Sequence, residues 1–256
     1  MRIATWNVNS VRARLERLLP WLEERAPDVV FLQETKCEDH LFPREPIEDL
    51  GYEAAVFGQK TYNGVAILAR GGLEDVARGF GRAEYDGEAR VIGATRGDVM
   101  LLNVYVVNGQ EVGCDKYHRK LEWLAALRDH VREHHPRTEK VVVAGDFNIT
   151  FDDRDVYDPE AWREQILCST PEREALAGLL DLGLHDALRK FTAAGGIYTW
   201  WDFRTRGFER GDRGLRLDHF LLSPPALAAA TAVEVDRAAR AGPRPSDHAP
   251  VILTLE

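Results

Sequence analysis

Apolar runs separated by short polar breaks recur along the chain and predict buried β-strands. The most continuous of these runs cover residues 2–6, 28–33, 99–107, 139–146, 215–222 and 249–255. Uninterrupted apolar runs of this kind are typical of strands that are buried on both faces. Shorter runs at 52–57, 64–69 and 91–95 predict further strands, and a turn at Gly97 and Asp98 predicts that 91–95 and 99–107 form a hairpin.

Leucines at helical spacing predict helices between these strands, over residues 10–25, 115–132 and 172–182. The first helix joins two runs into a β-α-β unit, for which we expect parallel strands. Pro20 lies within this helix and predicts a kink or a split. Residues 151–171 lack periodicity and are expected to form a surface excursion. Because we see no linker, we expect a single α/β domain over residues 1–256.

Polar residues follow or interrupt the buried runs at five places. They are Asn7 with Asn9, Glu34, Asp146 with Asn148, Asp218, and Asp247 with His248. Most are equally compatible with turns or caps. Asp218 is harder to explain in this way, because it interrupts an apolar strand and a buried carboxylate needs a partner. If the strand ends meet, these residues form one cluster of carboxylates, amides and a histidine.

Four carboxylates in one cleft predict a bound cation, because they would otherwise repel one another. Oxygen ligands without cysteine favour Mg²⁺ over zinc, and Mn²⁺ is a suitable substitute. Mg²⁺ usually takes one or two protein carboxylates and keeps several waters. The remaining acids are then available to orient the histidine or to hold a water molecule.

The composition limits the cellular setting. The chain has 256 residues, of which 45% are hydrophobic, and its three cysteines are too scattered for a disulfide framework. The N-terminus lacks the pattern of a signal peptide, and no apolar stretch is long enough to span a bilayer. We therefore expect a cytoplasmic, monomeric protein without membrane contact.

The formal net charge of −9 disfavours a nucleic-acid partner unless the basic residues are clustered. Three basic groups are present: Arg12, Arg14 and Arg17; Lys116, Arg119 and Lys120; and the five arginines from Arg204 to Arg216. Each group alone is compatible with an ordinary solvated face. Three such groups beside a predicted site favour a surface that binds phosphates.

Six motifs in order resemble those of the exonuclease III family of abasic-site endonucleases, within the wider endonuclease/exonuclease/phosphatase superfamily. The motifs are WNVN at 6–9, LQETK at 32–36, NVY at 103–105, GDFN at 145–148, RLD at 216–218 and SDH at 246–248. The resemblance covers essentially the whole chain. It implies a four-layer α/β sandwich, in which two mixed β-sheets pack face to face with flanking helices. The wider superfamily shares most of these motifs, so they indicate phosphoester hydrolysis more firmly than the substrate.

The resemblance also implies roles for individual residues. Glu34 is implied as the principal Mg²⁺ ligand with Asn7 beside it, and Asp247 as part of the metal shell. Asp146 and Asn148 are implied to bind and orient the attacking water, and Asp218 to pair with His248, which contacts the phosphate or takes the proton. The general base is left open between Asp146 and His248. The implied metal-binding set is Asn7, Glu34, Asp146, Asn148, Asp247 and His248.

The same resemblance implies how the substrate is held. Tyr105 is implied to stabilise the phosphate or the leaving oxygen, and Asn108 to contact the phosphate. Trp200, Leu215 and Leu217 are implied to wall a small apolar pocket that accepts a sugar without its base, whereas Trp201 is expected in the core. Lys116 and the arginines from Arg204 onward are expected to hold flanking phosphates.

We therefore expect incision of duplex DNA 5′ to abasic sites, with 3′→5′ exonuclease activity and cleaning of blocked 3′ ends. The alternatives are a less specific DNA phosphodiesterase, a phosphoinositide or sphingomyelin hydrolase, and a non-catalytic nucleic-acid-binding relative. Three positions depart from the family pattern or complicate it: Val107, where relatives often carry proline; Asn9, where some carry aspartate; and His219, which directly follows Asp218.

Overall fold

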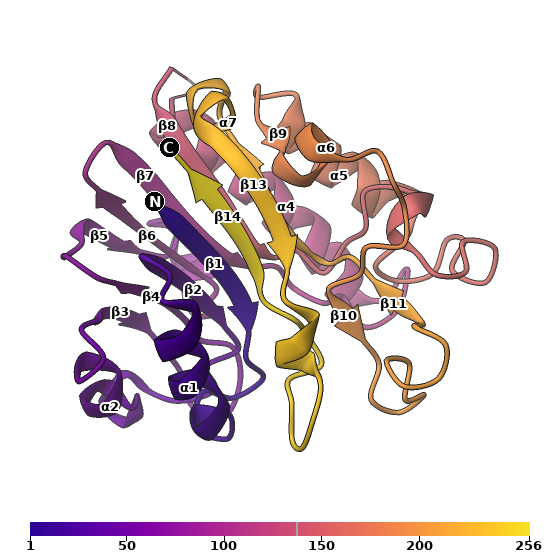
Figure 1. The fold of residues 1–256 in the computed structure, drawn as a ribbon. Helices are drawn as coiled ribbons and strands as arrows, with labels where there is room; N and C mark the ends of the chain where they lie inside the picture. The colour runs from indigo at the N-terminus through magenta and orange to yellow at the C-terminus, as the bar shows by residue number, and fades with distance from the viewer. Residues whose placement is uncertain (137) are drawn as a thin grey trace.

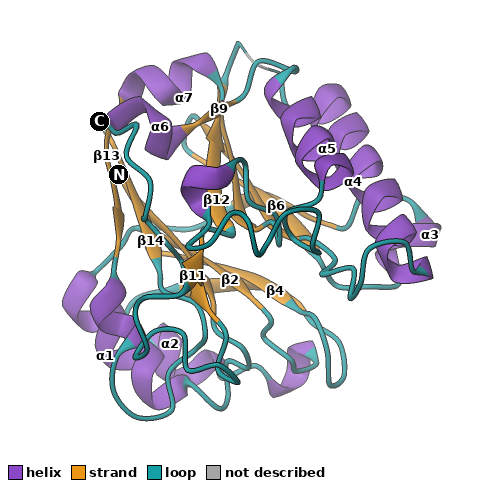
Figure 2. Ribbon diagram, turned by 90° about the vertical axis from the view of Figure 1, so that its right-hand side faces the viewer, coloured by secondary structure: helices purple, strands orange, loops and turns teal. Residues whose placement is uncertain are grey.

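The fold is a four-layer sandwich of two six-stranded sheets with helices on both outer faces (Figures 1 and 2), as expected from the sequence. It is seen in a computed structural model that describes residues 1–136 and 138–256. The first sheet has the order β13-β14-β1-β2-β4-β3, and the second has the order β5-β6-β7-β8-β12-β9. Both sheets are mixed, because β1 and β2 are parallel, as are β7 and β8, while the other pairs are antiparallel.

The strands of the first sheet are β1 (Arg2–Asn7), β2 (Val29–Gln33), β3 (Glu53–Phe57), β4 (Val65–Ala69), β13 (Ala230–Val235) and β14 (Val251–Leu255). Those of the second are β5 (Glu74–Arg78), β6 (Val91–Arg96), β7 (Val99–Tyr105), β8 (Lys140–Asp146), β9 (His185–Asp186) and β12 (Asp218–Leu222). A separate ribbon pairs β10 (Trp200–Trp201) with β11 (Gly214–Leu215). The α-helices are α1 (Leu15–Arg25), α2 (Arg44–Glu48), α3 (Ala83–Asp86), α4 (Asp115–His134), α5 (Thr170–Leu180), α6 (Ala187–Phe191) and α7 (Pro224–Ala229). Three 3₁₀ turns complete the described chain: η1 (Asp39–Leu41), η2 (Asp153–Asp155) and η3 (Arg237–Arg240).

Strand β8 illustrates why the apolar runs are continuous. Val142 and Ala144 point into the core between the two sheets, whereas Val141 and Val143 pack beneath α4 and α5. Successive side chains on a strand point to opposite faces, so a strand that is covered on both sides must be apolar throughout. The two-sided burial that the sequence predicts for this strand is confirmed.

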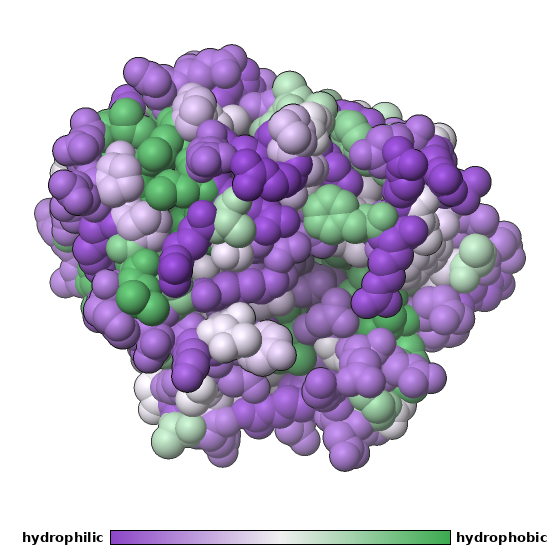
Figure 3. Space-filling model, turned by 90° about the horizontal axis from the view of Figure 1, so that it is seen from below, coloured by the Kyte–Doolittle hydropathy of each residue, from purple (hydrophilic) through white to green (hydrophobic). Residues whose placement is uncertain are grey.

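The parallel pairs bring the ends of several strands to one edge of the sandwich. The carboxyl ends of β1 and β2 lie together, and β12 begins there because Asp218 is paired with Asp146 at the end of β8. This edge faces downward in Figure 1. Seen from below, it is covered mainly by hydrophilic residues and is hollowed near its middle (Figure 3). No helix in the described chain combines the length and apolar character needed to cross a membrane.

Three local expectations were wrong in whole or in part. Helix α1 begins at Leu15 and continues through Pro20, so the helix is not split there, although Pro20 forgoes one backbone hydrogen bond; the alternative of a kink stays a prediction. The run 215–222 is two strands, β11 and β12, because the chain leaves one ribbon and joins the second sheet at residues 216 and 217. Residues 151–171 are not only a surface excursion, since Asp155 and Leu167 are buried.

Candidate active site

Six side chains from separate parts of the sequence meet at the edge where β1, β2 and β8 end. We call this group the strand-end cluster: Asn7, Glu34, Asp146, Asn148, Asp218 and His248. Five of the six are at most 5% exposed, and the Glu34 side chain is 18% exposed. The convergence expected from the strand-end positions is therefore present in the fold.

Asn7 joins two carboxylates of the strand-end cluster. Its Nδ2 donates to Oε1 of Glu34 and to Oδ2 of Asp146, at 2.9 Å in each case. The other oxygen of Glu34 lies 2.6 Å from Nζ of Lys36, a cation that the sequence analysis did not single out. Two carboxylates and an amide close together, without a thiolate among them, fit the oxygen ligands that Mg²⁺ or Mn²⁺ prefers.

His248 and Asp218 form a buried pair. Nδ1 of His248 donates to Oδ2 of Asp218 at 2.8 Å, and its Nε2 lies 3.6 Å from Oδ2 of Asp146. Suitable ligand atoms of Asp146, Asp218 and His248 all lie within 4.8 Å of one another, as a divalent-metal site requires. This arrangement directs Nε2, the other ring nitrogen, toward the centre of the cluster.

Burial and neighbouring charges shift the pKa values of Asp146 and His248. Burial is the largest influence on Asp146 and raises the pKa of its carboxyl well above the ordinary value. Burial alone would lower the pKa of His248, but the carboxylates of Asp218 and Asp146 outweigh it and raise that pKa. The imidazole can therefore carry a proton at neutral pH and stabilise negative charge that develops beside it.

Asn148 is held in an unusual backbone conformation at the end of β8. Its φ of 51° lies in the left-handed region, which asparagine tolerates better than most residues. Its N–H donates to Oδ1 of Asp146 at 2.8 Å, and its Nδ2 donates to the carbonyl of Val106 at 3.0 Å. Nδ2 of Asn108 donates to Oδ1 of Asn148 at 3.2 Å, so the two predicted asparagines are in contact.

Tyr105 ends β7 beside the cluster and is only 9% exposed. Burial, followed by the charges of Glu34 and Asp146, raises the pKa of its phenol well above the ordinary value. The hydroxyl therefore stays protonated and can donate a hydrogen bond to a phosphate oxygen.

The carboxylate of Asp247 accepts hydrogen bonds from two neighbouring side chains. One carboxylate oxygen accepts from Nδ2 of Asn9 and the other from Nε1 of Trp200, at 2.9 and 3.0 Å. Its place in the metal shell stays a prediction, whereas its contacts show that it ties the Trp200 ribbon to the loop after β1. Trp200 also forms an isolated β-bridge with His248.

The expected apolar pocket wall is mostly closed. Leu215 and Leu217 are 0% and 1% exposed, because they pack with Val156 and Leu167 in a small core beneath Trp200. Of the three implied wall residues, only Trp200 reaches the surface, where it is half-buried. Trp201 is fully buried, as expected.

The basic surface is smaller than the sequence suggested. Lys116 and Arg204 are exposed, as a phosphate-binding role requires. Arg216 is buried in ion pairs with Asp155 and Asp186, so its expected contact with phosphate was wrong. Lys120 is likewise buried, in an ion pair with Glu172.

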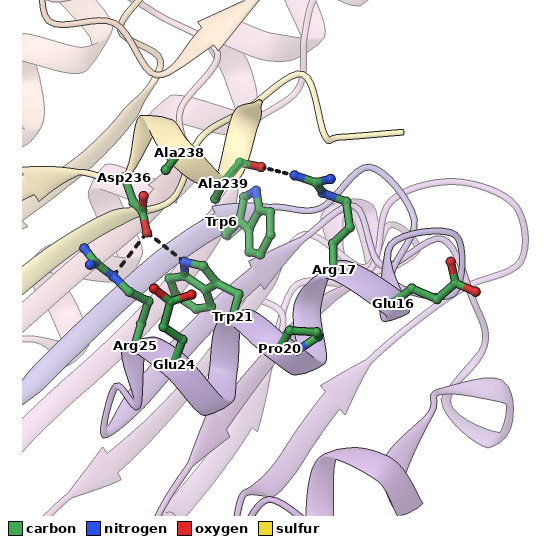
Figure 4. Close-up of a pocket in the computed structure, with 10 residues that line it drawn as sticks. All are labelled: Trp6, Glu16, Arg17, Pro20, Trp21, Glu24, Arg25, Asp236, Ala238 and Ala239. Carbon is green, nitrogen blue, oxygen red and sulfur yellow. Dashed lines mark hydrogen bonds and ion pairs between the residues drawn. The ribbon is translucent and has the colours of Figure 1, made fainter. Parts of the chain in front are cut away.

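A pocket of about 350 Å³ lies behind the cluster, between α1 and the segment around η3 (Figure 4). Trp6 and Trp21 pack against each other there, with ring centroids 5.2 Å apart. Nε1 of Trp21 donates to Asp236, and Nε1 of Trp6 donates to the carbonyl of His248. Trp6 thus supports the backbone of His248 from this side, and no residue of the strand-end cluster lines the pocket.

The chain belongs to the endonuclease/exonuclease/phosphatase family, which it matches over residues 4–248. Within that family it is a phosphoester-cleaving nuclease of the exonuclease III and AP endonuclease group. It is 34% identical to exodeoxyribonuclease III of Haemophilus influenzae, over 98% of both chains.

Solved structures of the same group superpose closely on the whole chain. NExo of Neisseria meningitidis, a 3′-5′ exonuclease, is 45% identical over 100% of both chains, with a TM-score of 0.97. A second structure, of the 3′ phosphatase NExo from Neisseria with a product DNA hairpin, covers 100% of this chain and 99% of its own (44% identity, TM-score 0.96). An AP endonuclease from Archaeoglobus fulgidus is 33% identical, over 100% of this chain and 99% of its own, with a TM-score of 0.96.

Proposed function

We propose that this protein is a Mg²⁺-dependent DNA repair enzyme that acts on 3′ ends, removing 3′ phosphates and 3′ nucleotides from duplex DNA. The observation that carries the proposal is the buried His248–Asp218 pair, which faces Asp146 next to the Asn7-bridged carboxylates. This arrangement offers a proton acceptor, a positive charge and oxygen ligands within one cleft. Those are the components that hydrolysis of a phosphoester requires.

In this proposal, different residues of the site bind the attacking water, contact the phosphate and orient the imidazole. Asp146 and Asn148 hold the attacking water, and the carboxylate of Asp146, which faces Nε2 of His248, accepts the water's proton. His248, Asn108 and Tyr105 donate hydrogen bonds to the phosphate oxygens as charge builds on them. Asp218 keeps the imidazole in its orientation and stabilises its protonated form.

A divalent cation would be held by Glu34 and Asp146, with Asn7 keeping the two carboxylates together. When bound, the cation neutralises charge on the phosphate and assists the leaving oxygen. Lys36 contacts the same carboxylate of Glu34 and orients it. Lys116 and Arg204, both exposed, would hold phosphates of the DNA backbone.

Incision 5′ to abasic sites, which the sequence analysis ranked first, is the second candidate activity. The AP endonuclease from Archaeoglobus fulgidus supports it through its likeness to the whole chain. The buried Leu215 and Leu217 favour action at 3′ ends instead, because the apolar wall for a flipped sugar is not open. The 44–45% identity to the Neisseria exonuclease and 3′ phosphatase supports the same ranking.

The test compares four labelled duplexes that share one sequence. One carries a 3′ phosphate at a nick, one a recessed 3′ hydroxyl, one an internal tetrahydrofuran abasic analogue, and one no lesion. Each is incubated with Mg²⁺ or with EDTA. The Asp146→Asn variant is a negative control, because it keeps the shape of the side chain but removes the proton acceptor.

We expect Mg²⁺-dependent loss of the 3′ phosphate and 3′ nucleotides, with slower incision at the analogue. Faster incision at the analogue than at either 3′ end would reverse the ranking of the two activities. Cleavage of the intact duplex at random internal positions, at the same rate, would overturn both.

A further inference from the structure

Lys120 is a lysine that lies behind the cluster rather than on the surface of α4. Its side chain is 0% exposed. Nζ donates to the main-chain carbonyls of Asn148 and Asn108, at 2.7 and 3.1 Å, and pairs with Glu172. An ammonium has three hydrogens, so its donors are fully used by these three acceptors.

The two carbonyls belong to the asparagines whose side chains meet at the site. Asn148 has a φ of 51°, a conformation that persists only where surrounding contacts enforce it. Asp146 holds the N–H of Asn148, and Lys120 holds its carbonyl. The peptide groups on both sides of the Asn148 side chain are therefore fixed.

The loop that carries Asn108 is fitted to the stem of the same lysine. A Cβ at Gly109, whose φ is 93°, would lie 3.1 Å from Cδ of Lys120 and 2.9 Å from Cδ1 of Ile166. Only glycine allows the backbone to approach this closely in that conformation. This loop therefore packs against the methylene groups of Lys120 and also accepts a hydrogen bond from its ammonium.

Glu172 anchors the ammonium from the other side. It accepts from the N–H of Leu167 at 3.1 Å, and from the N–H and hydroxyl of Ser169 at 3.1 and 2.6 Å, in the capping box that begins α5. The ion pair thus connects the start of α5 with the two loops that carry Asn108 and Asn148. It places a support on the buried side of the site.

We propose that Lys120 is a positioning residue for phosphoester hydrolysis, which it serves by fixing the main chain of Asn108 and Asn148. This inference rests on the proposed function. Removing the ammonium leaves two buried carbonyls without a donor, so the asparagines lose their common support. We expect kcat to fall by about 10- to 100-fold, the usual cost of losing a residue that orients functional groups.

Three variants separate positioning from folding. Glu172→Gln keeps the ammonium, and glutamine can still serve in the capping box. Lys120→Met/Glu172→Gln removes the ammonium without leaving an unpaired buried charge. Leu127→Ala, buried on the same helix, destabilises α4 by a cavity and touches neither asparagine. Lys120→Leu/Glu172→Gln, which likewise has no donor at position 120, replaces the methionine double variant, under the same criteria, if the latter does not fold.

Each variant is assayed below its melting temperature, with the 3′-phosphorylated duplex and saturating Mg²⁺. The inference predicts that the double variant loses kcat relative to Glu172→Gln, while KM and DNA affinity stay within twofold. It predicts that Leu127→Ala keeps kcat despite a lower Tm. The inference is overturned if the double variant keeps kcat, if KM rises and DNA affinity falls as much as kcat does, or if Leu127→Ala loses as much kcat.

A wild-type protein without Mg²⁺-dependent activity would contradict the proposed function instead. In that event the side-chain amide NMR signals of Asn108 and Asn148 still test the support itself. They should shift in the double variant and stay in place in Leu127→Ala. Unshifted signals in the double variant would show that Lys120 does not fix the asparagines.

Discussion

The carboxylate of Asp218 lies 2.8 Å from Nδ1 of His248, and both side chains are almost completely buried. Because Asp218 accepts a hydrogen bond from Nδ1, the other ring nitrogen, Nε2, faces Asp146. Oδ1 of Asp218 is buried without a partner, so the pairing with His248 is the contact that compensates this carboxylate.

Replacing Asp218 by asparagine should therefore damage catalysis more than binding. Asp218→Asn keeps the size of the side chain but removes the charge that stabilises the protonated imidazole. We expect kcat to fall by about 100-fold or more, with DNA affinity unchanged. Single-turnover release of phosphate and fluorescence anisotropy measure the two quantities. Asp98→Asn, at an exposed ion-paired carboxylate in the turn between β6 and β7, is the matched control and should keep its activity. Loss of affinity in step with rate would argue against this role for the pair.

Trp200 should act through its ring rather than through its hydrogen bond. Trp200→Phe loses the contact with Asp247 and keeps an aromatic face, whereas Trp200→Ala loses both. We expect KM to rise by about tenfold in the alanine variant, within the range of one lost stacking contact, and by much less in the phenylalanine variant. Steady-state kinetics on the 3′-phosphorylated duplex make the comparison. Equal effects of the two substitutions would instead assign the importance to the hydrogen bond.

His219 is a structural histidine whose neutral form supports the fold. It is 1% exposed, its Nε2 lies 2.8 Å from the carbonyl of Ile149, and burial, followed by the charge of Arg216, lowers its pKa to about 4. The unfolded chain binds this proton near pH 6.5 and the folded chain does not, so stability is lost as the pH falls from about 6.5 to about 4. The loss is about 3 kcal/mol in the free energy of unfolding.

His219→Gln should remove this part of the pH dependence, because glutamine can donate to Ile149 but does not titrate. Urea unfolding at pH 7, 6, 5 and 4 gives the difference between wild type and variant. Two half-buried histidines, His130 and His135, titrate in the same range and cancel in that difference. A difference that stays constant across these pH values would show that folding does not lower the pKa of His219.

The parts of the site that the sequence could predict are those that follow directly from strand order. Asn7, Glu34 and Asp146 each end an apolar run, and parallel strands bring their carboxyl ends to one edge. The alternation along β8 likewise follows from its unbroken apolar run. These features are local in the sequence, so the strands and the polar residues at their ends could be predicted from it, whereas the four-layer arrangement followed from the resemblance of six motifs to a known family.

The contacts that were missed depend on partners far away in the sequence. Arg216 looks like a surface cation until Asp155 and Asp186 are placed beside it, and Asp155 lies in a segment without periodicity. Lys120 and Glu172 look like ordinary polar positions of two helices, since their pairing depends on how α4 packs against α5. Composition and spacing do not show which charged residues pair in the fold. Counting basic residues therefore overstated how many of them lie exposed on the surface.

The central claim is that the acids of the strand-end cluster hold a divalent cation, and Mn²⁺ binding in the absence of DNA tests it most directly. Electron paramagnetic resonance measures free Mn²⁺ as it is titrated into wild type and into Glu34→Gln, with Glu23→Gln on the exposed face of α1 as the control. We predict saturable binding that Glu34→Gln weakens by about tenfold or more and Glu23→Gln leaves unchanged. Equal binding by all three proteins, or no binding by wild type at millimolar Mn²⁺, would contradict the account.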